Sequence, residues 1–304
     1  KLGDIVDSTP VYVGAPHFDY PDSFSVPDYS TFWQAHKDRM PVVYVGANDG
    51  MLHGFEASAQ GGREVLAFMP SPLFDAIADL TSPGYGDSVA HRYFVNASPN
   101  VADVVVDGAW RTVLVGGLGA GGQGLYALDV THPKQFAEHL AGTLVMWEFT
   151  DANDADLGYT FGLPAVTRLA NGQWAVLIGG GYNATAADSA VSAQGNAVVF
   201  ALNVADGSVI RKFDTQVGSA EDPLGQGRPN GIGAVSPVDI NGDRITDFVY
   251  AGDLFGNLWK IDLQSRVSSD WHIKTDAGGV PLPLFVATDR DAQRLPISVP
   301  PEVG

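Results

Sequence analysis

The chain has 304 residues, 45% of them hydrophobic and 10% aromatic, a composition that excludes an intrinsically disordered protein. Its formal net charge of -18 excludes a surface that neutralises nucleic-acid phosphates and favours an accumulation of divalent cations around the protein. The absence of cysteine excludes disulfide bonds, thiolate zinc sites and a cysteine nucleophile.

Glycine and proline divide the sequence into short apolar segments, a pattern that predicts short strands joined by tight turns. One recurring segment begins with a small residue and a proline and continues with alternating apolar residues. It reads STPVYVG (8–14), ASPNVADVVV (97–106), GLPAVTRL (162–169) and VSPVDI (235–240), and near the end ISVPPEV (297–303).

The other recurring segment is an apolar strand that ends in glycine, followed by a turn and a second strand. It appears at residues 42–57, 112–130, 175–213 and 247–263. We expect Asn48-Asp49-Gly50 and Ala205-Asp206-Gly207 to supply the positive φ angles of tight hairpins. Together the two segments predict four-stranded antiparallel units, and therefore an all-β protein with a modified β-propeller fold and quinoprotein-like blades.

We expect residues 1–304 to form a single β-propeller domain that is a fragment of a longer chain. The predicted blades cover roughly residues 1–60, 95–130, 160–213 and 233–263, and a partial blade covers 284–304. The last residues, 298–304, would pair either with the first blade or with a further segment.

Three insertions with helical character interrupt the repeat. Residues 15–40 contain a short predicted helix with Ser30 as its N-cap, 71–80 one with Pro72 at its first position, and 131–142 one capped by Thr131. Insertions of this kind often carry the specific function of a repeat protein. Trp33, in the first insertion, is the tryptophan that we expect to be exposed and to contact a partner.

The sharpest functional signal is DINGDRITD, residues 239–247, where oxygen-bearing side chains recur at alternate positions. Asp239, Asn241, Asp243 and Asp247 supply side-chain oxygens, and Ile245 can supply its backbone carbonyl. Calcium takes about six to eight such oxygens, and the flanking strands would hold the loop at both ends. The sequence therefore predicts a calcium site. The alternative is a turn whose Asp and Asn side chains accept backbone N–H groups.

Other candidate sites are weaker. Asp151, Asn153, Asp154 and Asp156 form a second acidic cluster, which we interpret as a solvated loop rather than a cation site. The glycine-rich stretch GGLGAGGQG (116–124) is followed by a strand and lacks lysine, so it predicts a hairpin rather than a phosphate-binding loop. Neither a metal-binding histidine spacing nor a nucleophilic serine motif is present, so we expect no catalytic site.

Several stretches carry a resemblance to a known family: GDIVDSTPVYVG, VVYVGANDGMLHGFEA, SPGYGDSVAHRYFVNASPNVADV, LGYTFGLPAV and SPVDINGDRITDFVYAGDLFGNLWKIDL. Over essentially its whole length the chain resembles the C-terminal propeller domain of PilY/PilC-type type IV pilus tip-associated adhesin and biogenesis proteins. The resemblance implies a modified β-propeller whose calcium ligands are Asp239, Asn241, Asp243, the carbonyl of Ile245, and Asp247. Some members carry an integrin-binding Arg-Gly-Asp tripeptide, which this sequence lacks.

The resemblance also implies a role in pilus biogenesis, with regulation of pilus extension and retraction, twitching motility and surface attachment. Its expected partners are major or minor pilin subunits and a host or abiotic surface, with no nucleic acid and no membrane-spanning segment in this chain. The expected location is outside the cytoplasm, on the cell surface, the pilus and the outer membrane. Two alternatives remain: a fragment of a quinone-cofactor propeller dehydrogenase, and a passive adhesin scaffold in which calcium is purely structural.

Overall fold

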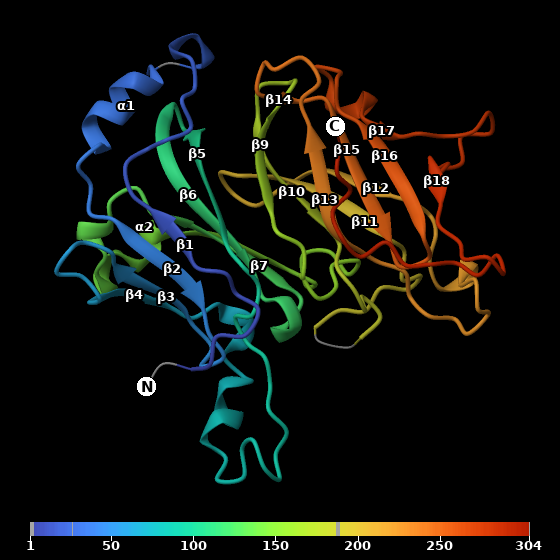
Figure 1. The fold of residues 1–304 in the computed structure, drawn as a ribbon, viewed down its shortest axis with the longest axis horizontal. Helices are drawn as coiled ribbons and strands as arrows, with labels where there is room; N and C mark the ends of the chain where they lie inside the picture. The colour runs from blue at the N-terminus through green and yellow to red at the C-terminus, as the bar shows by residue number, and fades with distance from the viewer. Residues whose placement is uncertain (1–2, 26, 187–188, 304) are drawn as a thin grey trace. The chain divides into compact units, whose positions relative to one another are not determined.

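The computed structural model describes residues 3–25, 27–186 and 189–303. The chain divides into two compact units, of which unit 1 comprises Lys1–Glu148 with Ala205–Gly207, and unit 2 comprises Phe149–Val204 with Ser208–Gly304. The regular structure is mainly β-strand, as predicted (Figure 1). No helix in the described ranges has both the length and the apolar character needed to cross a membrane.

In its described residues, unit 1 contains two four-stranded sheets whose strands follow one another in sequence order. The first is β1-β2-β3-β4, with antiparallel pairing throughout, and the second is β5-β6-β7-β8. The strands are β1 (Val11–Val13), β2 (Val42–Gly46), β3 (Leu52–Glu56), β4 (Glu64–Phe68), β5 (Asn100–Val106), β6 (Ala109–Gly117), β7 (Gly124–Asp129) and β8 (Val145–Thr150), the last two residues of which belong to unit 2.

Unit 2 contains the other two sheets, in the orders β12-β11-β10-β9-β14 and β13-β15-β16-β17, with β18 also paired to β16. One pairing departs from the predicted antiparallel units, because β14 adds to β9 in the parallel direction. The strands are β9 (Ala165–Leu169), β10 (Trp174–Gly179), β11 (Val198–Asn203), β12 (Val209–Asp214), β13 (Ile232–Val238), β14 (Ile245–Thr246), β15 (Phe248–Asp253), β16 (Asn257–Asp262), β17 (His272–Ile273) and β18 (Phe285–Val286).

The hairpin turns use glycine for their left-handed backbone. Gly50, between β2 and β3, has a φ of 93°, and Gly207, between β11 and β12, has a φ of 71°. Asn48 and Asp49 do not share the positive φ that the sequence pattern suggested. Asp49 instead accepts the backbone N–H of Met51 with its carboxylate, so an Asx-type contact replaces part of the predicted turn chemistry.

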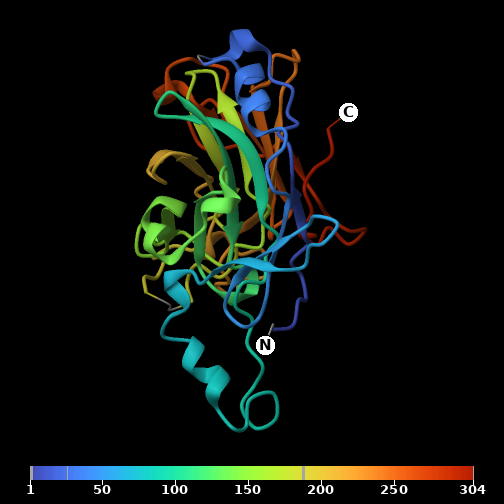
Figure 2. The ribbon, with the colours of Figure 1, turned by 90° about the vertical axis from the view of Figure 1, so that its left-hand side faces the viewer.

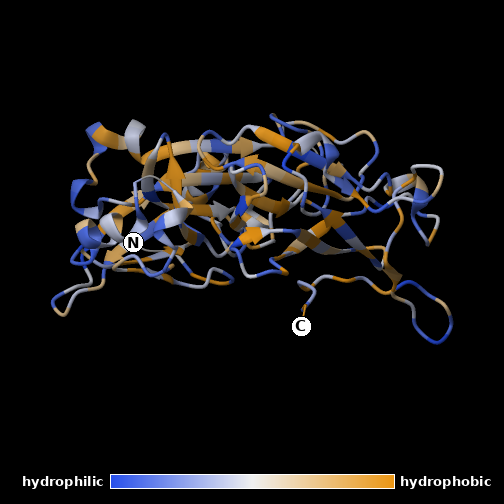
Figure 3. Cartoon of the chain, turned by 90° about the horizontal axis from the view of Figure 1, so that it is seen from above, coloured by the Kyte–Doolittle hydropathy of each residue, from blue (hydrophilic) through white to orange (hydrophobic). Residues whose placement is uncertain are grey.

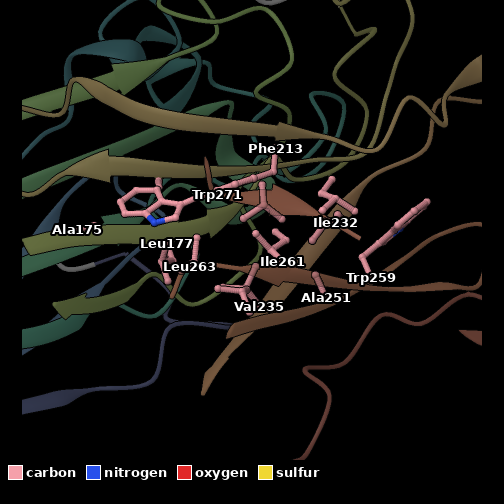
Figure 4. Close-up of a cluster of buried hydrophobic side chains, with 14 of the residues drawn as sticks. Ala175, Leu177, Phe213, Ile232, Val235, Ala251, Trp259, Ile261, Leu263 and Trp271 are labelled. Atoms are coloured by element: carbon pink, nitrogen blue, oxygen red, sulfur yellow. The ribbon is translucent and has the colours of Figure 1, made fainter. Parts of the chain in front are cut away.

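Each unit has its own apolar core. In unit 2 buried side chains of β10, β11, β15 and β16 form one cluster that includes Trp259 and Trp271, which are 1% and 0% exposed (Figure 4). Unit 1 has an equivalent core in which Tyr44 and Leu114 are fully buried. Burying one large apolar side chain contributes about 1.5–3 kcal/mol. The hydropathy colouring accordingly places apolar residues on the strands and polar residues on many connecting loops (Figure 3).

The insertions form shorter helices than predicted, and their caps differ. α1 (Tyr29–His36) exists, but Ser30 lies inside it and Asp28 is its N-cap. Pro72 lies in a single 3-10 turn, and Thr131 bonds to Asp129 instead of capping a helix. The segment after β4 extends away from the unit 1 sheets (Figures 1 and 2). The short helices are α2 (Ala141–Leu144) and 3-10 turns at Asp22–Phe24, Ser71–Leu73, Ile77–Thr81, Gly119–Gly121, Pro133–Gln135, Glu138–Leu140, Ser219–Glu221 and Ser268–Asp270.

Two further stretches can be compared with their predictions. The glycine-rich stretch 116–124 is the turn between β6 and β7, which confirms the predicted hairpin. Residues 297–303 form no strand and bond to the last unit 2 sheet: Ile297 donates its N–H to the Asp253 carbonyl, and the Ser236 hydroxyl donates to the Pro301 carbonyl. The fifth blade and its pairing therefore stay predictions.

Candidate metal centre

The five predicted ligand residues lie in one exposed loop of unit 2, between β13 and β15. The chain leaves β13 at Val238, reverses through Gly242 and Arg244, passes through the two residues of β14, and enters β15 at Phe248. Gly242 and Arg244 have φ angles of 78° and 65°, and such left-handed backbone lets the loop curl tightly. The predicted strand–loop–strand arrangement is therefore present.

Asp239, at the start of this loop, gathers three backbone N–H groups. Its Oδ1 accepts the N–H groups of Asn241 and Gly242 at 3.1 and 2.7 Å, and its Oδ2 accepts that of Arg244 at 2.6 Å. Partial burial acts to raise the pKa of Asp239, but these backbone donors outweigh it and hold the pKa below the ordinary 3.8. Asp239 is therefore an ionised carboxylate around which the loop backbone is wrapped.

The next two predicted ligands continue the same pattern at steps of two residues. Asn241 Oδ1 accepts the N–H of Asp243 at 2.9 Å, and Asp243 Oδ1 accepts the N–H of Ile245, also at 2.9 Å. Both side chains are exposed. This ladder of Asx turns fixes the direction of each side chain relative to the backbone.

Asp247 closes the loop from the inside. It is 8% exposed, and its Oδ2 accepts the N–H of Ile240 across the loop at 2.9 Å. Its backbone N–H donates to the Val238 carbonyl at 2.9 Å, and its carbonyl accepts the N–H of Leu263 at 2.8 Å. Asp247 thus joins the two ends of the loop to the sheet beneath them.

The exit of the loop also joins two sheets of unit 2. Ile245 and Thr246 form β14, which pairs in parallel with Arg168 and Leu169 of β9 and is the edge strand of the β9–β12 sheet (Figure 1). The Thr246 and Thr167 hydroxyls share a hydrogen bond of 2.7 Å. A change in the loop at Ile245 therefore reaches the β9–β12 sheet as well as the sheet of β13 and β15.

The donor chemistry of the loop suits calcium. An ionised carboxylate has about four lone-pair positions, so an oxygen that accepts a backbone N–H can also bind a cation. The predicted ligand set consists entirely of hard oxygens, which calcium prefers. In the conformation described for residues 3–25, 27–186 and 189–303, no three acidic or histidine side chains are arranged to hold a metal ion. The loop residues fit calcium by donor type, and binding would draw the outer carboxylates together.

In the second acidic cluster, 151–156, a lysine of the chain offsets the negative charge of two carboxylates. The Lys212 ammonium lies 2.7 Å from Asp154 Oδ1 and 2.5 Å from Asp156 Oδ2. Asp151, 3% exposed, accepts the backbone N–H groups of Ser189 and Ala190. The stretch is a loop, as predicted, but its carboxylates are not simply solvated. Lys212 lies between two of them, and no spacing rule indicates that a lysine 56 positions after Asp156 would do so.

Two buried polar clusters that shape the hairpins were not predicted from the sequence. Asp253, fully buried, accepts the Trp259 indole N–H at 2.9 Å and the Asn257 backbone and amide N–H groups at 2.8 Å. The spacing of Asp, Asn and Trp in GDLFGNLW was the available signal. The cluster orders the β15–β16 turn just beyond the core, and its role is structural.

The other missed cluster centres on His53 in β3, which is 4% exposed. Its Nδ1 lies 2.5 Å from Glu64 Oε1 and its Nε2 3.0 Å from Asp49 Oδ1. Burial acts to lower the pKa of His53, but the two carboxylates outweigh it and raise the pKa above 6.5. A histidine at an inward strand position, four residues after an aspartate, was the signal in the sequence.

Comparison with known proteins identifies relatives along nearly the whole chain. A family model described as the PilY1 beta-propeller domain matches residues 2–289. A "Type IV pilus biogenesis factor PilY1 homolog" of Xylella fastidiosa is 38% identical over 309 residues, which cover 98% of this chain and 20% of that protein. The "Type IV pilus biogenesis factor PilY1" of Pseudomonas aeruginosa is 43% identical over 273 residues, or 88% of this chain and 21% of that protein.

A solved structure supports the same relationship. The crystal structure of the Pseudomonas aeruginosa PilY1 C-terminal domain matches with a TM-score of 0.73 and 36% identity, covering 96% of this chain and 55% of that one. This similarity confirms the predicted β-propeller class. The chain spans about a fifth of the length of the curated relatives that it matches.

Proposed function

The chain belongs to the family of PilY1 β-propeller domains, and from this premise we propose that it is a calcium-binding module that regulates a type IV pilus. The family consists of pilus biogenesis factors and not of enzymes, so the dehydrogenase alternative is dropped. The proposed calcium ligands are Asp239, Asn241, Asp243, the carbonyl of Ile245, and Asp247. The loop 239–247 carries the proposal, because its oxygen-bearing side chains are already ordered by its own backbone.

Calcium would act on the loop through its charge and its demand for several oxygens. It would relieve the mutual repulsion of Asp239, Asp243 and Asp247 and hold them closer together. Because Ile245 and Thr246 also pair with β9, an ordered loop would clamp two neighbouring sheets of unit 2. Calcium can shift a pilus machine between states only if it binds them with different affinity.

The proposed setting is the surface of a bacterium. The relatives are named as type IV pilus biogenesis factors, and this chain is associated with the same machinery. We place it outside the cytoplasm, on the pilus and the outer membrane, with pilin subunits and a host or abiotic surface as its partners. Its calcium state would set the balance of pilus extension and retraction, and with it twitching motility and attachment.

Calorimetric titration with calcium tests the ligand assignment. The wild-type chain should give a binding heat that is lost in Asp243→Ala, an exposed position whose truncation spares the fold. Asp276→Ala is the matched control, because Asp276 also accepts two backbone N–H groups in an exposed turn that lies outside the loop. A heat that persists in Asp243→Ala, or one that disappears in Asp276→Ala, contradicts the proposed site.

A passive scaffold with structural calcium is the second candidate. The pairing of the loop exit with β9 and the hydrogen bond between Thr246 and Thr167 favour it. The two candidates separate in a bacterium that carries Asp243→Ala in its chromosomal gene. A regulatory site predicts altered twitching with normal amounts of folded protein. Normal pili and twitching, combined with a lower thermal stability of the purified variant, would favour the passive role.

A further inference from the structure

A second candidate site lies in unit 1, in the insertion between β1 and β2, and uses no residue of the calcium loop. A pocket of about 420 Å³ opens beside α1, within the size range of small-ligand sites. Its wall combines aromatic rings with hydrogen-bonding side chains, among them Tyr20, Tyr29, Trp33, Asp19, Asp22 and Gln34. α1 lies beside β5 and β6 in two views (Figures 1 and 2).

The back wall of this pocket is fixed to the β5–β8 sheet. Tyr29 is 3% exposed, and its hydroxyl donates to Asp103 Oδ2 at 2.5 Å and accepts the backbone N–H of Phe18 at 3.1 Å. Asp103, fully buried in β5, also accepts the Thr112 hydroxyl at 2.6 Å. A buried, fully bonded carboxylate therefore anchors the insertion, and the pocket is formed before a ligand arrives.

Stacked rings extend the wall beside Tyr29, since Tyr20 and Trp110 both contact its ring. Tyr20 stacks on Phe24 and on Trp110, with ring centroids 5.2 and 5.3 Å apart. The Trp110 indole N–H donates to the Pro27 carbonyl at 2.8 Å. Such stacks restrict ring rotation. The Tyr20 ring is therefore held in place, and Trp33 is the lining ring that stays exposed.

The rim is polar and carries negative charge. The Asp22 carboxylate accepts both the backbone N–H and the hydroxyl of Ser30, at 2.9 and 2.8 Å, and so ties the loop to the first turn of α1. Asp19 has a left-handed backbone with a φ of 51°. Asp19, Gln34 and Trp33 are all exposed, with Trp33 at 37%. The expected exposure of Trp33 is confirmed, and acceptors, donors and a ring face meet at one opening.

From this combination we infer that the pocket binds a neutral pyranose unit of a glycan. An aromatic face packs against the apolar C–H face of a sugar ring, while carboxylate, amide and hydroxyl groups bond to the sugar hydroxyls. The lining residues include no cationic side chain, and the carboxylates of Asp19 and Asp22 would repel a uronic or sialic acid.

A cationic side chain of a peptide is the competing ligand, and two features weigh against it. The Lys37 ammonium lies 5.8 Å from the centre of the Trp33 ring, so a second cation at this ring would meet a like charge. The pocket also faces the N-terminal turn of α1 at Ser30, where the helix dipole disfavours positive charge. A neutral sugar is repelled by neither charge, and it reaches the Trp33 ring once the exposed Lys37 side chain turns away.

Saturation-transfer NMR on the 304-residue chain tests the inference. The probes are methyl glucoside, methyl galactoside, methyl mannoside and N-acetylglucosamine, each at millimolar concentration. We expect transfer to at least one probe, concentrated on one face of its ring. Trp33→Ala should weaken binding about tenfold, which corresponds to about 1.4 kcal/mol, because the stacking surface is lost. Tyr93→Ala, a truncation of similar exposure outside the pocket, should leave binding unchanged.

The Asp19→Asn variant distinguishes sugar binding from the binding of a cationic side chain. Asparagine also tolerates the left-handed backbone and keeps an acceptor, so sugar binding should change by no more than about twofold. Binding of tetralysine through the pocket would instead fall with Asp19→Asn and with added salt. Circular dichroism checks that each variant is folded. The inference is overturned if no pyranoside receives saturation, if Trp33→Ala and Tyr93→Ala behave alike, or if only tetralysine binds.

Discussion

Two acidic loops of unit 2 differ in what offsets the repulsion between their closely spaced carboxylates. In the loop 151–156, the Lys212 ammonium lies within 2.7 Å of both Asp154 and Asp156. In the loop 239–247, the carboxylates of Asp239 and Asp243 take backbone N–H groups instead. Backbone N–H groups carry only partial charge, so under our proposal a calcium ion would supply to the second loop the full positive charge that Lys212 supplies to the first. A cluster of acids indicates a metal site only where the fold leaves its charge uncompensated.

The largest expected effect comes from Asp247→Ala, which removes the buried carboxylate of the second loop. The Ile240 N–H loses its hydrogen bond to this carboxylate, and a hydrogen bond to a charged group contributes about 1.5–3 kcal/mol. We expect urea unfolding to show this loss and calorimetry to show no calcium heat. Asp243→Ala should lose the heat with a stability change below about 1 kcal/mol. A calcium-binding heat retained in Asp247→Ala would contradict the assignment of Asp247 as a ligand, and with it the proposed difference between the two loops.

Lys212→Met should produce the next largest effect, now in the first loop. The three side chains of this ion pair network are only 21–26% exposed, so removing the ammonium leaves two neighbouring carboxylates poorly solvated. We expect a loss of about 1–2 kcal/mol in the free energy of unfolding. Lys274→Met, at an exposed lysine of the same unit, is the control and should change stability by less than about 0.5 kcal/mol. Equal losses in the two variants would show that Lys212 does not compensate the acidic loop.

The two loops should also respond to pH in opposite directions. The pKa of Asp239 is depressed, so its stabilisation is present above 3.8 and is lost as the pH falls through the lower folded value. For Lys212, burial acts to lower the pKa, but Asp154 and Asp156 raise it above 10.5; its stabilisation is present below 10.5 and is lost as the pH rises through the folded value.

Urea unfolding of wild type, Asp239→Ala and Lys212→Met across the pH range checks both directions. The stability difference between wild type and Asp239→Ala should shrink in acid, and the difference between wild type and Lys212→Met should shrink in strong alkali. Differences that stay constant with pH would mean that neither side chain changes its protonation free energy on folding.

The smallest expected effect comes from a double variant in which the loop 151–156 becomes able to bind calcium in place of the loop 239–247. In a Lys212→Met, Asp243→Ala double variant, the first loop has lost its internal cation and the loop 239–247 has lost a proposed calcium ligand. Calcium at a concentration about equal to its dissociation constant for the loop 151–156 should then stabilise the double variant by about 0.4 kcal/mol. Asp243→Ala alone should show no such gain. Thermal unfolding with and without calcium measures it. No gain would mean that the geometry of 151–156, and not Lys212, keeps metal out.

The sequence predicted the parts of the fold that depend on local periodicity. Alternating apolar residues located the strands on both sides of 239–247, and β13 and β15 lie there. The spacing of Asp239, Asn241 and Asp243 likewise predicted a tight polar loop, since Asx turns are local contacts. The family relationship confirms the β-propeller class that these units suggested.

Contacts between residues far apart in the sequence could not be predicted. Lys212 meets Asp154 only because β12 folds back beside that loop, and no spacing rule joins the two residues. The pairing of β14 with β9 involves two residues, too few to show any periodicity. The first turn of α1 is bound by Asp22, eight positions before Ser30, where sequence rules had placed the cap on Ser30 itself.

The parallel pairing of Ile245 and Thr246 with β9 makes the last two sheets of unit 2 mutually dependent. A shortened protein that ended between Asp214 and Ile232 would keep β9, β10, β11 and β12 but would lack β14. The edge of β9 that pairs with β14 would then be exposed. That bare edge would be open to pairing with strands of other molecules. Expression of such fragments should accordingly give aggregates, and efforts to divide the domain into smaller working pieces should cut elsewhere.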